Sequence, residues 1–211
     1  MNSTLQENKN SGKSAGGGQR SKITTKQELK DWLLYETQKY GRSNWSIRNI
    51  IPLSERDILV KHQILLRKTE YYKNINSRVR YRLCSLCLGR IQQKYMLHIP
   101  LNVFGRGLKV MHLGPILVNS RCHVGEDCSL HINTSLVAGG TNDDVPVLGN
   151  HVVVGVGAVI VGGVHIADYT AIGANAVVNK DVQEENTCVA GVPARKISNN
   201  GSREWNKKNK R

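Results

Sequence analysis

Two histidines, His112 and His131, interrupt a regular pattern of apolar residues, and their side chains have the chemistry of an acid–base catalyst. A neutral imidazole, with an ordinary pKa near 6.5, can take the proton of a hydroxyl group as that group attacks an electrophile. His112 lies one six-residue period before Val118, where an inward aliphatic side chain is expected. His131 directly follows Leu130, where most repeats carry glycine or alanine. His112 is therefore a candidate general base, and His131 is a candidate for orienting a substrate or acting as a second catalytic group. A packed histidine at 112 and a surface histidine at 131 are the alternatives.

The pattern is interrupted again at residues 138–145, AGGTNDDV, which fill a gap of double length and should protrude as a loop. Glycine leaves its backbone N–H accessible, so Gly139 and Gly140 are candidates for stabilising the oxyanion of a tetrahedral intermediate. Asp143 and Asp144 are candidates for binding an acceptor hydroxyl. Acidic residues on an exposed loop tip, without a role in binding, are the alternative.

These exceptions stand out because one apolar residue returns every six positions between residues 118 and 182. This period fits neither the 3.6 residues of a helical turn nor a series of hairpins, and a short fixed repeat is typical of a solenoid. A second small or β-branched residue follows each anchor by four places, as on one flat face of a three-sided coil. We therefore predict a mainly β fold, a parallel β-helix. The anchors are Val118, Val124, Leu130, Leu136, Leu148, Val154, Ile160, Ile166, Ile172 and Val178.

Several motifs in this region resemble those of a known family. The segments GRGLKVMHLGPILVN, VAGGT and AGVPAR resemble landmarks of serine acetyltransferases, which are hexapeptide-repeat acyltransferases with a left-handed parallel β-helix. The segments HIPLNVFGRGL, MHLGPI and IGANAVVNKD resemble more closely the branch that O-acetylates sugars of capsular and other surface polysaccharides. The similarity covers roughly residues 99–197. It implies a left-handed β-helix at residues 98–198.

The resemblance also implies an activity. It predicts an acetyl-CoA-dependent O-acetyltransferase that acts on a sugar or glycan hydroxyl, needs no metal and assembles as a homotrimer. His112 matches the catalytic histidine of the family by its motif, and acetyl transfer would be direct. Coenzyme A would lie between adjacent β-helices near the last coils. The candidate contacts are Ala174, Ala176, Gly191, Ala194, Arg195 and Lys196.

Two departures from the serine acetyltransferase pattern argue against free serine as the acceptor. Leu97 occupies the position of the aspartate that orients the catalytic histidine, and the neighbouring His98 is a candidate replacement. The loop that carries a second histidine in those enzymes is shorter here. Serine O-acetyltransferase remains the alternative enzyme, and a non-catalytic trimeric scaffold is the alternative outside enzymes. A metal enzyme of the γ-carbonic anhydrase type is disfavoured, because too few histidines could meet.

Ahead of the repeat, residues 23–97 predict a basic helical region. Thr25 with Glu28 forms a capping-box motif, Ser54 with Asp57 opens a second helix, and a third helix is expected at about residues 77–97. His62 falls on the apolar side of the second helix and is expected to be packed in the core. The polar segments 1–22 and 199–211 are expected to be disordered.

Charge and cysteine usage suggest the surroundings of the chain. Residues 1–100 carry nineteen Lys or Arg and seven Asp or Glu, whereas residues 101–198 carry six and eight. The basic ends suggest contact with an anionic membrane or polymer, and solvated basic surfaces are the alternative. No nucleic-acid partner is expected. Five cysteines and the lack of a long apolar stretch predict a cytoplasmic protein, peripheral at most to the inner membrane face.

Overall fold

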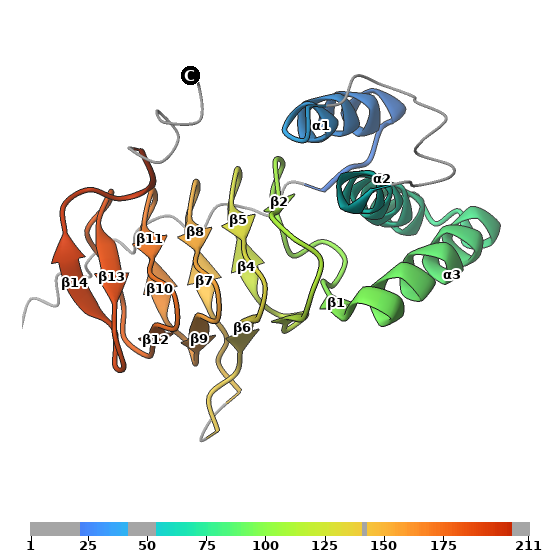
Figure 1. The fold of residues 1–211 in the computed structure, drawn as a ribbon. Helices are drawn as coiled ribbons and strands as arrows, with labels where there is room; N and C mark the ends of the chain where they lie inside the picture. The colour runs from blue at the N-terminus through green and yellow to red at the C-terminus, as the bar shows by residue number, and fades with distance from the viewer. Residues whose placement is uncertain (1–21, 42–53, 141–142, 204–211) are drawn as a thin grey trace, which may run out of the picture.

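The computed structural model describes residues 22–41, 54–140 and 143–203, which form three helices followed by a β-helix (Figure 1). The helices are α1 (Lys26–Gln38), α2 (Glu55–Asn74) and α3 (Arg78–Tyr95). The predicted capping box of α1 is present, because the Thr25 side chain accepts from the Glu28 N–H and the Glu28 carboxylate accepts from the Thr25 N–H. Ser54 caps α2 in the same manner by accepting from the Asp57 N–H.

The strands wind into coils whose three faces are three sheets, with the orders β1-β3-β6-β9-β12, β10-β7-β4 and β14-β13-β11-β8-β5-β2. Every pairing of strands is parallel except that of β13 with β14. The strands are β1 (Leu97–His98), β2 (Lys109–Val110), β3 (Ile116–Val118), β4 (His123–Val124), β5 (Ser129–Leu130), β6 (Thr134–Val137), β7 (Val147–Leu148), β8 (Val153–Val154), β9 (Val159–Val161), β10 (His165–Ile166), β11 (Ala171–Ile172), β12 (Val177–Val178), β13 (Cys188–Ala190) and β14 (Arg195–Ser198).

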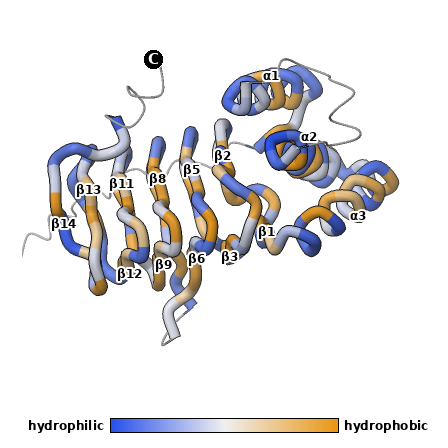
Figure 2. Tube along the Cα trace, in the orientation of Figure 1, coloured by the Kyte–Doolittle hydropathy of each residue, from blue (hydrophilic) through white to orange (hydrophobic). Residues whose placement is uncertain are grey.

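The six-residue pattern makes the core of this β-helix. All ten anchors are buried, as are most of the small residues four places after them, including Cys122, Cys128 and Ala158. Figure 2 shows apolar segments recurring on successive coils, with polar residues at many of the turns. Burying a stack of aliphatic side chains is the main source of stability in such a repeat, because each coil covers its neighbour.

A buried ionic cluster joins the helices to the first coil. The Arg67 guanidinium, fully buried on α2, pairs with Glu36 and Glu70 at 2.8 Å each and donates to the carbonyl oxygens of Phe104 and Gly105. Glu36 in turn accepts from the Gly107 N–H at 2.8 Å. These bonds satisfy charges that would be costly to bury alone. They fix α1 and α2 against the start of the β-helix, and thereby place the beginning of α2.

The structure corrects the expected position of His112. Val110 pairs with Leu130, twenty residues on, whereas Val118 pairs with Leu136, eighteen residues on. Two extra residues therefore lie between β2 and β3, and the period cannot be extended back from Val118. The inward position belongs to Val110, and His112 is exposed in the longer turn.

The tail also differs from the expectation of disorder. Gly201 and Ser202 are buried, and the Ser202 N–H donates to the carbonyl oxygen of Tyr169 at 2.8 Å. Residues 199–203 therefore pack on the β-helix. Residues 204–211 lie outside the described residues, as do residues 1–21 of the predicted N-terminal tail.

Candidate active site

The turns after β2, β5, β8 and β11, together with the segment after β13, form one corner of the β-helix. We call it the histidine corner, and it consists of residues 111–115, 131–133, 155–158, 173–176 and 191–194. Backbone bonds stack these turns, since the Met111 N–H donates to the Leu130 carbonyl and the His131 N–H to that of Val154, at 2.9 and 3.1 Å. Parallel stacking therefore brings His112 and His131 together on neighbouring coils.

The two histidines differ in their surroundings. The side chain of His112 is 59% exposed, whereas His131 is partly buried between the turns of its neighbours. Partial burial lowers the pKa of His131, and the nearby imidazole of His112 and ammonium of Lys109 lower it further. His131 is therefore kept neutral at neutral pH, and the His112 ring is close enough to act on its charge.

A carboxylate that the sequence analysis did not single out lies beside His112. Glu55, the first residue of α2, has its Oε2 atom 3.6 Å from Nδ1 of His112. Its Oε1 atom accepts from the Leu113 N–H at 2.7 Å. The acidic first turn after Ser54 was visible in the sequence as a helix-start signal, but nothing in the sequence pairs it with a turn 57 residues away.

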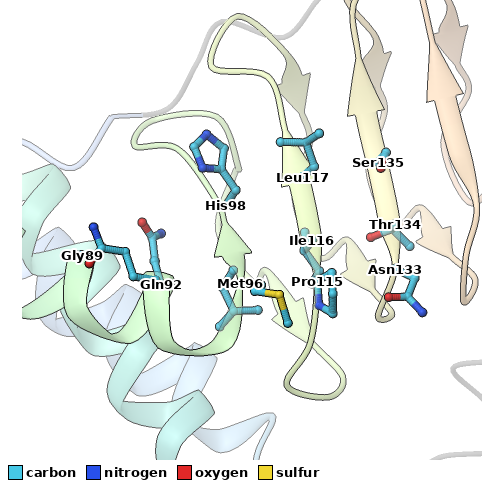
Figure 3. Close-up of a pocket in the computed structure, with 12 residues that line it drawn as sticks. Gly89, Gln92, Met96, His98, Pro115, Ile116, Leu117, Asn133, Thr134 and Ser135 are labelled. Carbon is cyan, nitrogen blue, oxygen red and sulfur yellow. The ribbon is translucent and has the colours of Figure 1, made fainter.

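The expected partner of His112, His98, lies elsewhere. Leu97 is fully buried on β1, and His98 lines a groove of about 660 Å³ between α3 and the sheet of β1, β3 and β6 (Figure 3). Exposed Met96 and Leu117 line the same groove. Among the ion pairs of the described residues, His112 pairs with the carboxylate of Glu55.

The predicted coenzyme A contacts lie at the other end of the histidine corner. Ala174, Gly191, Arg195 and Lys196 are exposed there, Ala194 is partly buried, and Lys196 pairs with Glu184. The Ala176 side chain is fully buried in the coil, so a contact at this residue would be made by its backbone, and its role stays a prediction.

The loop of residues 138–145 protrudes as expected, below β6 in Figure 1, although residues 141 and 142 lie outside the described part. His131 precedes β6 and the loop follows it, so the length of this strand, roughly 10 Å, separates the two. The Gly139 N–H points to the carbonyl oxygen of Asp144 at 3.4 Å, and Arg121 holds the exposed Asp143. Within one chain, the candidate oxyanion and acceptor residues therefore lie apart from the histidines.

Comparison with known proteins identifies similar sequences in the region of the β-helix. The chain is 37% identical over 98 residues to a serine acetyltransferase of Helicobacter pylori, a match that covers 44% of this chain and 56% of that protein. It is 35% identical over 103 residues to a serine acetyltransferase of Synechococcus elongatus, covering 47% and 41%. The chain thus spans about half the length of these curated relatives. No family model matches the sequence.

The solved structures extend this similarity into the helical region. A Brucella abortus serine acetyltransferase in complex with coenzyme A superposes with a TM-score of 0.62 at 23% identity, over 84% of this chain and 70% of that one. The chain has the serine acetyltransferase fold. The predicted left-handed parallel β-helix is therefore confirmed, and the relatives support the resemblance to hexapeptide-repeat acyltransferases. The closer resemblance to the surface-polysaccharide branch stays a prediction.

Among the described residues, no group of three or more His, Cys, Asp or Glu side chains is arranged to hold a metal ion, and Cys84 and Cys87 lie on α3. None of the described helices is both long and apolar enough to cross a membrane.

Proposed function

We propose that this protein is an acetyl-CoA-dependent O-acetyltransferase whose active site lies on the histidine corner. The observation that supports this proposal is that the candidate residues for catalysis and for coenzyme A binding lie along the same corner. His112 and His131 lie at one end, and the exposed candidates for coenzyme A binding lie at the other. Four steps of about 4.8 Å separate the coils of β2 and β13, or roughly 19 Å, which is comparable to an extended phosphopantetheine arm. The complex of a structural neighbour with coenzyme A supports this donor.

The proposed chemistry is direct transfer. The acceptor hydroxyl attacks the thioester carbonyl of acetyl-CoA while Nε2 of His112 takes the hydroxyl proton. The tetrahedral oxyanion then collapses, the bond between carbon and sulfur breaks, and the imidazolium returns a proton to the leaving thiolate. His131 is neutral beside this base and is placed to hydrogen-bond the acceptor or the oxyanion.

Serine is the first acceptor to test, because the similar proteins are named serine acetyltransferases. This reverses the order of acceptors expected from the sequence. A sugar hydroxyl is the second candidate, because the buried Leu97 offers no carboxylate where the resemblance expects one. Both reactions release coenzyme A, so one assay can compare them.

In a homotrimer, the loop of residues 138–145 of one copy would lie beside the histidine corner of a neighbouring copy. Gly139, Gly140, Asp143 and Asp144 lie apart from His112 in one chain, and we propose that they serve the corner of a neighbouring copy. The exposed apolar residues Met96 and Leu117, which line the same groove, support an association of this kind, since exposed apolar surface favours burial.

The test is release of free thiol from acetyl-CoA by the full chain, with serine, a monosaccharide or a surface glycan as the acceptor. Rapid turnover with serine supports serine acetylation and contradicts the sugar acceptor. Turnover with the glycan alone reverses that conclusion. If no acceptor is acetylated and calorimetry detects no coenzyme A binding, the enzymatic proposal is wrong and the scaffold alternative stands.

A further inference from the structure

We propose that Glu55 is the positioning residue for His112, a role that rests on the proposed function of His112 as the base. The helical region thus supplies part of the active site, although the β-helix carries the histidines. Glu55 approaches the base from outside the coil, at the first residue of α2. It takes the place of the carboxylate that Leu97 cannot provide.

The geometry suits this role because one carboxylate holds two parts of the same turn. Oε1 of Glu55 accepts from the Leu113 N–H at 2.7 Å, which fixes the carboxylate against the backbone next to His112. Oε2 faces Nδ1 of His112 at 3.6 Å, beyond hydrogen-bond length but within ion-pair range. Catalytic contacts are often long in a free enzyme and shorten in the substrate complex. A proton on Nδ1 would face this carboxylate, which leaves Nε2 free to accept the acceptor's proton.

Positive charge also lies near this turn. Burial and the charges of Lys39 and Arg56 lower the pKa of Lys109, and burial and the charges of His112 and Lys109 lower the pKa of His131. The Glu55 carboxylate is the anion beside His112, so it would offset the positive charge that forms when His112 takes the proton.

Stability does not explain the contact. The side chains of Glu55 and His112 are 48% and 59% exposed, and exposed ion pairs contribute little to folding. By contrast, the Arg67 cluster that fixes the body of α2 is fully buried. The fold therefore holds the beginning of α2 in place without needing the Glu55 side chain.

Three variants of Glu55 in the full chain test the proposal by the thiol-release assay. We expect Glu55→Ala to lower kcat by about 10- to 100-fold, less than loss of the base itself, with KM for acetyl-CoA changed by less than about twofold. Glu55→Gln keeps an acceptor for the Leu113 N–H but lacks the charge, so it should lose most of the same activity. Glu55→Asp should recover part of it. Asp31→Ala, which removes an exposed carboxylate from α1, is the matched control.

The second readout is the tautomer of His112, measured by nitrogen NMR of the imidazole at a pH where it is neutral. The wild-type ring should carry its proton on Nδ1, and Glu55→Ala should shift it toward Nε2. If the wild-type protein is active and needs His112, but Glu55→Gln keeps near wild-type kcat and the tautomer does not change, Glu55 is only a backbone anchor and the inference is wrong. An inactive wild-type protein would instead overturn the proposed function, and the tautomer would still test the contact.

Discussion

At the scale of single residues, the histidine corner combines an exposed imidazole with a partly buried one. His112 is open to a substrate, whereas burial and the neighbouring charges lower the pKa of His131. Two neighbouring imidazoles with different surroundings can take different roles, because only one of them needs to gain a proton during the reaction.

Replacing the base tests this division directly. We expect His112→Asn to lower kcat by about 10²- to 10⁴-fold, because a general base contributes a factor of this size. Steady-state release of thiol measures the change. His165→Asn is the matched control, since His165 is exposed on β10 and pairs with Asp181 away from the corner. Wild-type turnover by His112→Asn would contradict the assignment.

At the scale of elements, the helices depend on the Arg67 cluster and the candidate site depends on turns between strands. Arg67 binds two carboxylates and two backbone carbonyls across α1, α2 and the first coil. The β-helix continues from that coil by stacking alone. The join between the helical region and the coils is therefore polar, although the interior of the coils is apolar.

Loss of Arg67 should be costly. Arg67→Ala leaves Glu36 and Glu70 buried without their cation, and we expect a loss of about 3–5 kcal/mol in the free energy of unfolding. Urea denaturation followed by circular dichroism measures it. Arg90→Ala on the exposed face of α3 should change stability by less than about 0.5 kcal/mol. A small effect at Arg67 would mean that the cluster does not anchor the helices.

The protruding loop offers a separate test. Deleting residues 139–144 restores the six-residue step between Leu136 and Leu148, and the contact of Gly139 with Asp144 already brings the two ends of this segment together. We expect the midpoint of thermal unfolding to change by only a few degrees, because surface loops contribute little to the core. Acetyl transfer should fall at least about tenfold if the loop serves an active site. Full activity in the deletion variant would exclude that role.

At the scale of the whole molecule, one buried histidine should govern the response to mild acid. His62 is fully buried, as predicted, and neither ring nitrogen has a hydrogen-bond partner among the described residues. Burial, with the nearby charge of Arg67, lowers its pKa to about 4. The unfolded chain binds a proton near pH 6.5, whereas the folded chain resists protonation until the pH is far lower, so folding is favoured above this range.

Stability should fall as the pH drops from about 6.5 toward 4, and the part due to His62 should reach about 2 kcal/mol between pH 7 and pH 5. Denaturation midpoints at the two pH values measure it. His62→Leu should remove this part, whereas His165→Leu, at an exposed site, should retain it. An unchanged pH dependence in His62→Leu would show that His62 is not the titrating group.

The exposed surface of α3 is basic. Arg78, Arg80, Arg82 and Arg90 are exposed on α3 and lie on the same helix as the exposed Val79 and Leu83. Contact with an anionic membrane or polymer through this region stays a prediction, as does the cytoplasmic location. Binding to vesicles with and without anionic lipid would test it.

The sequence by itself determined the β-helix, because its coils are local and each anchor meets a neighbour at a fixed separation along the chain. The capping residues likewise determined where α1 and α2 begin, and the double-length gap predicted the loop. His131 was also recognisable, since it stands where most coils carry glycine or alanine, and His112 was recognisable by its match to a family motif.

Only the tertiary structure decided how these parts meet. Two extra residues between β2 and β3 move His112 from an inward position to an exposed turn, which a fixed period cannot reveal. Glu55 reaches His112 because the Arg67 cluster fixes α2 over the first coil. Such contacts join residues far apart in the chain, and their geometry depends on packing between elements rather than on any local pattern.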